Sequence, residues 1–449
     1  MEFEVIKARL DKLLAADNMG EMRGALMMLN VVDIAEYMDG LEKDGMLKTY
    51  RILPKDISAE VFTYLSDEQK QHLMECIGDS ETAELISNMF VDDAVDFLEE
   101  LPANLVTRLL KNVNEEQRKT INRFLNYPEN SAGSIMTIEF CSLKEGLTAA
   151  EAMKYLKQNS LDKETIYTLY VLGKSHELRG TLPLRRLILA DENVPVESIM
   201  STNFIYANTL DDQEAVAELV RKYDLMSVPI VDKEGRMVGI VTADDIMDVI
   251  EEEATEDIEK MNALLPSEDE YLKTKPVKLA RNRLPWLLFM MVSSIFTELI
   301  ITNFEGILKG TSAAFVACIP MLMGTGGNSG SQSSTLIIRG LALGDLTPKD
   351  ALKVLWKEFR VSMIVSLALG LVTFLIQYFV FAGENTIWSA LAISGAMVGT
   401  VVLAKCIGCT LPLLAKQLKL DPALMAAPII TTIVDVCSLL ILVAFASAV

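Results

Sequence analysis

A carboxylate in the middle of an apolar stretch is the first feature of this sequence that could do chemistry. Asp435 lies within residues 423–448, which can cross a bilayer because a membrane span takes roughly 20 apolar residues. An ionised aspartate at that depth costs about 2.5–3.5 kcal/mol on insertion scales, so such a residue indicates function by default. Thr431 and Thr432 lie one helical turn before it and Ser438 one turn after it.

The polar groups on this helical face would be mainly oxygen atoms. Pro428 has no amide hydrogen, so we expect the carbonyl of Leu424 to lose its helical partner. Carboxylate, hydroxyl and carbonyl oxygens are the ligands that hard cations prefer. The stretch therefore predicts a cation site inside a membrane, and a protonated aspartate in a helix-packing polar cluster is the alternative.

Charge and hydropathy are segregated along the 449 residues. Residues 1–273 have a net charge of −26 and residues 274–449 a net charge of +5. A strongly acidic first part argues against nucleic acid and favours cationic ligands, and the second part has the composition of a membrane domain. The N-terminus is acidic and amphipathic and has no signal-peptide character, so we expect the soluble part to stay in the cytosol.

Cys406 and Cys409 form a CxxC in an apolar segment, where helix packing explains them better than metal binding.

The elements that must position this chemistry begin with a helical N-domain over residues 1–130. Apolar residues recur there at helical spacing, and related acidic–apolar phrases start at Val32, Ile57 and Val91. This loose repeat suggests a superhelical stack of short helices. A dense negative patch lies within one helical turn; a solvated face is its ordinary interpretation and a cation site the sharper one. The patch consists of Asp92, Asp93 and Asp96.

Residues 131–250 alternate strand-like and helical runs in two similar units. The phrases Leu178–Ile188 and Met237–Met247 each make a short strand and enter a helix, and each unit contains an Ile-Met phrase, at Ile135 and Ile199. Here the chain resembles a tandem pair of α/β CBS domains.

Some CBS domains bind adenine nucleotides, with a threonine and an aspartate holding the ribose and phosphate. Thr242 and Asp245 match that motif in the second repeat, whereas the first repeat has Pro183 and Arg186 in their place. The resemblance therefore implies an ATP-type ligand at the second repeat, and a purely structural CBS pair remains the alternative.

A connecting helix over residues 251–272 should follow the CBS pair. One apolar stripe runs along it while its other faces are acidic, which destabilises a helix unless positive charge lies alongside. A solvated linker is the ordinary interpretation, and a mechanical role between the soluble part and the membrane is equally compatible with its position.

Residues 273–449 predict a transmembrane domain with five spans. Basic residues flank the first span on its N-terminal side and fill the loop between the second and third, which places the N-terminus inside and the C-terminus outside by the positive-inside rule. An odd number of spans favours a symmetric homodimer with the path on its axis. The predicted spans are residues 285–304, 313–336, 361–381, 387–414 and 423–448.

The second predicted span contains a Gly-, Ser- and Asn-rich phrase, GTGGNSGSQSSTLIIRGLALGD, starting at Gly324. Such polar backbone is costly against lipid, so it should face a partner helix or a water-filled path. This phrase and DPALMAAPIITTIVD, which ends at Asp435, resemble the MgtE family of magnesium channels. So does the order of domains, and the resemblance covers essentially the whole chain.

The resemblance implies a homodimeric Mg²⁺ channel of the cell inner membrane whose soluble domains bind Mg²⁺ as regulator and close the pore. Asp435 and Thr431 match the pore metal site, with Thr432, Asn328, Gly326 and Pro428 as further pore-lining candidates. The matching regulatory positions are Glu60, Asp92, Asp96, Asp212, Glu214, Asp224, Asp245, Asp248, Glu253, Glu256 and Asp257.

Other function classes remain as alternatives at this level. A CBS-regulated channel for Mn²⁺ or Co²⁺ would use the same oxygen ligands, and a secondary transporter for a solute would need paired broken helices that five spans do not readily give. An intramembrane metalloprotease would need a HExxH motif, but the two histidines, His72 and His176, lie outside the spans. We therefore expect a transport protein and not an enzyme.

Overall fold

The chain divides into two units, Met1–Ile250 and Glu251–Val449, each with a buried apolar core of its own. The structure is a computed structural model, and it describes residues 2–99, 101–161, 163–267, 271–272, 274–311, 313–381, 386–425 and 427–449. The last part of the predicted connecting segment, residues 268–270, lies outside the described residues.

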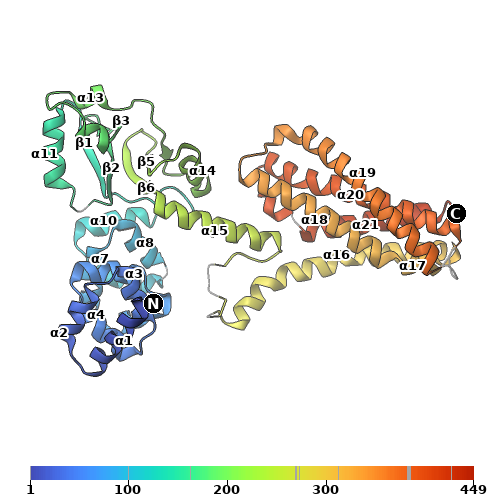
Figure 1. Cartoon of the computed structure of the whole chain (residues 1–449), viewed down its shortest axis with the longest axis horizontal. Helices are drawn as coiled ribbons and strands as arrows, with labels where there is room; N and C mark the ends of the chain where they lie inside the picture. The colour runs from blue at the N-terminus through green and yellow to red at the C-terminus, as the bar shows by residue number, and fades with distance from the viewer. Residues whose placement is uncertain are drawn as a thin grey trace. The chain divides into compact units, whose positions relative to one another are not determined.

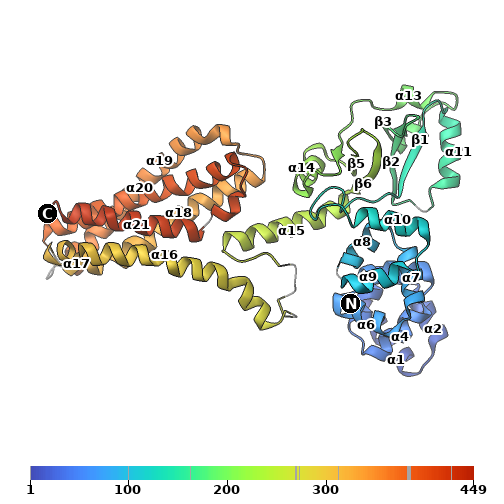
Figure 2. The ribbon, with the colours of Figure 1, turned by 180° about the vertical axis from the view of Figure 1, so that it is seen from behind.

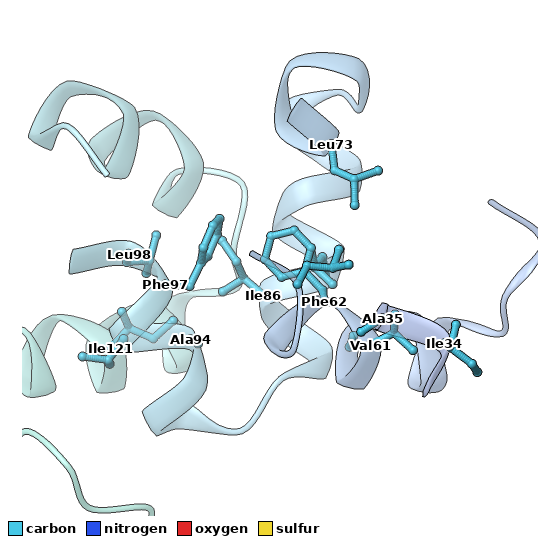
Figure 3. Close-up of a cluster of buried hydrophobic side chains, with 14 of the residues drawn as sticks. Ile34, Ala35, Val61, Phe62, Leu73, Ile86, Ala94, Phe97, Leu98 and Ile121 are labelled. Carbon is cyan, nitrogen blue, oxygen red and sulfur yellow. The ribbon is translucent and has the colours of Figure 1, made fainter. Parts of the chain in front are cut away.

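Short amphipathic helices make up the first half of unit one (Figure 1). Each has too little apolar surface to be stable alone, so the helices stack and bury their stripes against one another. Phe62 of α5 and Phe97 of α8 meet edge to face with their ring centroids 4.9 Å apart, and Ile86 of α7 lies beside them (Figure 3). The predicted stack of short helices is confirmed. The helices are α1 Glu2–Ala15, α2 Met19–Leu26, α3 Val31–Asp39, α4 Lys43–Ile52, α5 Lys55–Thr63, α6 Asp67–Cys76, α7 Asp79–Asn88, α8 Val91–Glu99, α9 Ala103–Leu110 and α10 Glu115–Phe124.

Two small sheets of the same topology follow, which confirms the predicted CBS pair. In each sheet the first strand pairs in parallel with the second, and the second pairs antiparallel with the third. Helix α11 packs its apolar face on the first sheet (Figure 1). The strands are β1 Phe140–Lys144, β2 Thr165–Leu172, β3 Leu178–Pro183, β4 Ala207–Asn208, β5 Ser227–Val231 and β6 Met237–Thr242. The helices are α11 Ala149–Asn159, α12 Leu184–Ile188, α13 Val196–Ile199 and α14 Gln213–Tyr223.

Each Ile-Met phrase packs against the opposite repeat, although the sequence places it at the start of its own. Thr137, after the first phrase, exchanges two backbone hydrogen bonds with Ile240 of β6, at 2.8 and 2.9 Å. A Cβ on Gly239 would lie 2.9 Å from the sulfur of Met136. Ser201 pairs with β3 of the first repeat in the same way. The two repeats are therefore interlocked and not merely consecutive.

Helix α15 (Ala243–Met261) begins in unit one as the last helix of the CBS pair and ends in unit two. The connecting helix is thus the second half of a longer helix, because no Gly or Pro interrupts the sequence between β6 and Met261. It ends at Met261, short of residue 272, where the sequence predicted its end, and Ala263 in the turn that follows has a positive φ of 56°.

Long helices form unit two, and α18, α20 and α21 lie side by side in both views (Figures 1 and 2). Four segments among the described residues are long and apolar enough to cross a membrane: Pro276–Phe304, Pro348–Val380, Ile387–Gln417 and Pro422–Ala446. The helices are α16 Pro276–Thr311, α17 Ala313–Ala317, α18 Ile319–Ala342, α19 Ala351–Leu375, α20 Ile387–Gln417 and α21 Ala427–Ala446. Short turns are η1 Pro348–Asp350, η2 Ile376–Val380 and η3 Pro422–Met425.

Several predicted spans are confirmed as long apolar helices, with three differences in detail. The second span is broken into α17 and α18, since Pro320 fits only the first turn of a helix. Helices α16 and α19 begin about ten residues before the predicted apolar segments, in stretches that mix apolar residues with lysine and arginine. Pro428 lies in the first turn of α21 and not inside a longer helix, so it frees no mid-helix carbonyl as the sequence suggested.

Candidate functional site

Asp435 lies near the middle of α21, as the sequence predicted, and its carboxylate is half-buried. It lines a cavity of about 420 Å³ with Met323 of α18 and a polar face of α16. The hydroxyls of Thr431 and Thr432 both donate to the carbonyl oxygen of Pro428 at 3.0 Å, and Thr432 also lies 3.4 Å from the hydroxyl of Ser293. The remaining lining residues are Ser294, Thr297, Glu298, Ile301 and Thr302.

The Gly-rich phrase of α18 faces partner helices, which is one of the two outcomes expected for it. A Cβ on Gly408 of α20 would lie 2.2 Å from the carbonyl oxygen of Gly330, so the two backbones touch. Gly326 is buried against α20 and α21, and Gly327 is in contact with Thr431. Asn328 is exposed on α18 and does not line the Asp435 cavity among the described residues.

A buried lysine inside the membrane unit is a feature that sequence reasoning missed. Lys405 of α20 is 5% exposed, and its ammonium donates to the hydroxyl of Ser333 at 3.3 Å. That hydroxyl donates in turn to the carboxylate of Glu358 at 2.7 Å. The chain of hydrogen bonds links α18, α19 and α20. A basic residue within a predicted span was the signal that could have revealed it.

The end of α15 forms an ionic contact with the loop before α21. The Lys260 ammonium lies 2.7 Å from Asp421 and 2.8 Å from Glu256. Burial opposes its charge, but these two hydrogen-bonded carboxylates raise the pKa of Lys260 above its usual range. Burial and the charge of Asp421 raise the pKa of Asp257. Glu253, the remaining predicted position on this helix, is half-buried one turn before Glu256 and Asp257.

Carboxylates from both halves of unit one crowd together. Asp92 and Asp93 of α8 lie close enough to Asp245 of α15 to perturb one another. Burial first, and then the charges of Asp93 and Asp245, raise the pKa of Asp92 well above its usual range. Burial and Asp245 raise the pKa of Asp93 to about 6, although Lys70 opposes the shift. We call Asp92, Asp93, Glu164 and Asp245 the acidic cluster.

Glu164 belongs to this cluster although its sequence position, just before β2, gave no motif to find it. Burial and the charge of Asp245 raise the pKa of Glu164 to about 7. Its Oε2 is buried without a hydrogen-bond donor among the described residues. A bound water or cation would satisfy a buried acceptor in that state. Of the predicted positions nearby, Glu60 adds to the negative field at Asp93, Asp248 adds to that at Asp245, and Asp96 is exposed on α8.

The predicted positions on α14 are spread out instead of clustered. Asp212 caps the start of the helix by accepting from the amide of Glu214 at 2.9 Å. Asp224 ends the helix in the left-handed conformation, with φ of 51°. Because a helix rises about 1.5 Å per residue, Asp212 and Asp224 lie more than about 15 Å apart within one chain.

Thr242 and Asp245, the candidate nucleotide residues, hydrogen-bond to each other. The Thr242 hydroxyl donates to Asp245 Oδ2, and the Thr242 amide lies 3.4 Å from the same oxygen. Asp245 therefore belongs both to the nucleotide motif and to the acidic cluster. Across the described ranges, no three His, Cys, Asp or Glu side chains are arranged as the ligands of one metal ion.

Three family models match the chain. One is described as a divalent cation transporter, MgtE, over residues 319–445; one as the MgtE intracellular N domain over residues 29–130; and one as a CBS domain over residues 196–252. These matches, with the fold, define a multi-pass membrane transporter of divalent cations with a CBS-containing soluble part.

Comparison with curated relatives identifies the family within this class of transporters. The chain is 35% identical to the magnesium transporter MgtE of Thermus thermophilus over 98% of this chain and 97% of the relative. It is 30% identical to the magnesium transporter MgtE of Bacillus subtilis over 100% of this chain and 98% of that relative. The chain belongs to the MgtE family of magnesium transporters, so the predictions of this family and of a transport protein are confirmed.

Solved structures resemble the soluble part. The crystal structure of the soluble part of a magnesium transporter aligns with a TM-score of 0.54 and 31% identity, covering 56% of this chain and 99% of the other. The cytosolic domain of the Mg²⁺ channel MgtE, solved in complex with ATP, aligns with a TM-score of 0.51 and 34% identity, covering 54% and 99%.

Proposed function

We propose that this chain is a Mg²⁺-selective channel for magnesium uptake that closes when intracellular Mg²⁺ binds its soluble domains. The observation that supports gating most directly is the acidic cluster. Asp92, Asp93, Glu164 and Asp245 come from segments far apart in the sequence and repel one another when ionised. A divalent cation would neutralise the cluster and hold the N-domain to the CBS pair.

Regulation then follows from differential affinity. At low Mg²⁺ the ionised carboxylates favour separation of α8 from the start of α15. Bound Mg²⁺ favours their association, so the cation shifts the gate by the difference in its affinity for the two states. The remaining acidic positions, on α14 and on the connecting helix over residues 251–272, are proposed as further regulatory sites. The acidic positions on α14 lie too far apart to bind one ion together. Other segments or a second subunit would therefore supply the remaining ligands of each site.

Permeation would centre on Asp435. Mg²⁺ gives up its water reluctantly and is commonly held by one or two carboxylates with several waters retained. A homodimer would supply one Asp435 from each subunit and so needs no compact three-ligand site within one chain. Thr431, Thr432, Asn328, Gly326 and Pro428 remain the proposed residues along the path. Mn²⁺ and Co²⁺ share the ligand preference and are the competing substrates.

We also propose that the second CBS repeat binds an adenine nucleotide through Thr242 and Asp245. The solved cytosolic domain of an MgtE channel in complex with ATP supports this assignment.

The proposed domains are the N-domain over residues 1–130, the CBS pair over 131–250 and the membrane domain from 273. The distribution of basic residues supports a cytoplasmic N-terminus and an outward C-terminus.

Reconstituted protein tests the permeation part. Mg²⁺ uptake into liposomes loaded with a Mg²⁺-sensitive dye should be fast for the unmodified chain and fall by at least about tenfold for Asp435→Asn, because a neutral amide removes the charge that offsets dehydration. Ser447→Ala, in the exposed turn just after the end of the same helix, is the matched control and should transport normally. Unchanged uptake by Asp435→Asn would overturn the pore assignment.

A further inference from the structure

One face of α16 is polar although the helix lies in a candidate membrane span. Ser294, Thr297, Glu298 and Thr302 recur at spacings of three and four, so they share a helical face. All of them line the Asp435 cavity. Val292, Phe296 and Leu299 project from the other side of the helix and are exposed, as suits lipid or another apolar surface.

Glu298 is the second carboxylate of this cavity. A charged side chain in a membrane span is expensive, and such residues usually face a bundle interior or a water-filled cavity. Glu298 is exposed within this one chain, but it lines the cavity that Asp435 lines from α21. Among the described residues, no lysine, arginine or histidine forms an ion pair with either Glu298 or Asp435.

The hydroxyls around Glu298 are arranged to accept. Ser294 donates its hydroxyl hydrogen to the carbonyl oxygen of Met290 at 2.9 Å, and Thr302 donates to that of Glu298 at 2.9 Å. With their hydrogens committed to the helix backbone, these oxygens present lone pairs to the cavity. Lone pairs and carboxylates are the groups that receive the donated hydrogens of a hydrated cation.

We propose that Glu298 is a cation-positioning and selectivity-determining residue of the pathway defined by Asp435. It accepts hydrogen bonds from the retained waters of Mg²⁺, and its charge favours a divalent over a monovalent ion in the cavity. This inference rests on the proposed function, since it assigns a second residue to the same path. The two carboxylates act from different helices, α16 and α21, so the distance between these helices sets the size of the hydrated ion accepted.

Flux into liposomes with the full chain tests this role. Initial Mg²⁺ uptake is measured against external Mg²⁺ for the unmodified chain, Glu298→Gln, Glu298→Asp and Thr302→Val, and K⁺ flux is measured without divalent ions. Glu298→Gln should raise the half-saturating Mg²⁺ concentration about tenfold, the order expected when one charge is removed near a divalent ion in a hydrated site, and should weaken the preference for Mg²⁺ over K⁺. Glu298→Asp keeps the charge and should stay close to the unmodified chain, and Thr302→Val should change affinity less than Glu298→Gln.

Two outcomes would overturn the proposal. One is a half-saturating concentration and an ion preference unchanged in Glu298→Gln; the other is equal damage by Gln and Asp, which would indicate packing. Failure of the proposed function is a separate result, since it appears as normal uptake by Asp435→Asn. If Glu298→Gln does not fold, Glu298→Cys is modified with a polar thiol reagent, with the unmodified chain as background for its own cysteines. Mg²⁺ should slow that modification, and a rate independent of Mg²⁺ would equally overturn the role.

Discussion

Lys260 at the end of α15 lies 2.7 Å from Asp421, fourteen residues before Asp435. The same ammonium contacts Glu256 at 2.8 Å, so one positive charge offsets carboxylates on the connecting helix and on the loop that begins α21. This pair joins the connecting helix, which bears proposed regulatory positions, to the element that bears the proposed pore carboxylate. It can hold the two together without a metal ion.

We expect Lys260→Met to make closure depend more strongly on Mg²⁺. Loss of the ammonium leaves Glu256, Asp257 and Asp421 to repel one another, so more Mg²⁺ is needed to hold α15 in place. A partly exposed ion pair contributes about 1 kcal/mol, which predicts a shift of about fivefold in the Mg²⁺ concentration for half-closure. Current recorded against cytosolic Mg²⁺ measures the shift.

A double-variant cycle checks that the pair is responsible. Asp421→Asn in the Lys260→Met background should recover part of the shift, because it removes one of the repelling carboxylates. Lys419→Met is the matched control, since Lys419 is an exposed lysine in the same loop and forms no ion pair among the described residues. Equal shifts for Lys260→Met and Lys419→Met would contradict a specific contact.

The acidic cluster predicts that stability depends on pH in a direction opposite to that of salt-bridged carboxylates. The folded unit raises the pKa of Asp93 to about 6 and of Glu164 to about 7, above their unfolded values of roughly 4. Their stabilising contribution is therefore complete below about pH 4 and is lost as the pH rises through about 6 to 7. Without Mg²⁺, the soluble domains should be less stable at about pH 8 than at about pH 5.

Mg²⁺ should reverse that loss only where the carboxylates are ionised. Limited proteolysis of the full chain should show strong Mg²⁺ protection of unit one at about pH 8 and weak protection at about pH 5, because protons occupy the cluster in acid. Equal ionic strength from NaCl is the control for screening. Protection of the same size at both pH values, or by NaCl, would argue against the cluster as the binding site.

Packing between α18 and α20 predicts a large difference between two glycines. Gly408→Ala would place a methyl group 2.2 Å from the Gly330 carbonyl oxygen, and backbone cannot move away cheaply. We expect a loss of roughly 1–3 kcal/mol or more and a clear drop in melting temperature in detergent. Gly324→Ala meets nothing within 4 Å and should be neutral or slightly stabilising. Equal melting temperatures for the two variants would contradict the helix contact.

The sequence was sufficient to predict those elements of the fold that have a characteristic period or length. Short helical stripes, two strand–helix repeats and long apolar runs each have a period or length that predicts the element, and Asp435 stood out because no other charge lies in its span. The partners of these residues could not be predicted, since they depend on tertiary contacts. Glu164 meets Asp92 only after the N-domain and the CBS pair have folded together, and no local spacing encodes that contact.

Two charged residues inside apolar helices were not singled out from the sequence. Glu298 and Lys405 are each the single charge of a predicted span, so the signal that marked Asp435 was present for them as well. The surroundings of these two residues are seen only in the structure, as the cavity that Glu298 lines and the hydrogen bond between Lys405 and Ser333. The interlocked Ile-Met phrases were visible as a repeat, but the exchange between repeats required the pairing of Thr137 with Ile240.

The measurement that tests gating most directly is channel current in inside-out patches as cytosolic Mg²⁺ is raised. The unmodified chain should close as Mg²⁺ rises, and Asp92→Asn combined with Asp245→Asn and Asp248→Asn should close less readily while still conducting through an intact Asp435 pathway. Neutral amides bind Mg²⁺ weakly, so we expect the half-closing concentration to rise by about tenfold or more. An unchanged Mg²⁺ dependence in the triple variant, or an unmodified chain whose current ignores cytosolic Mg²⁺, would contradict the account.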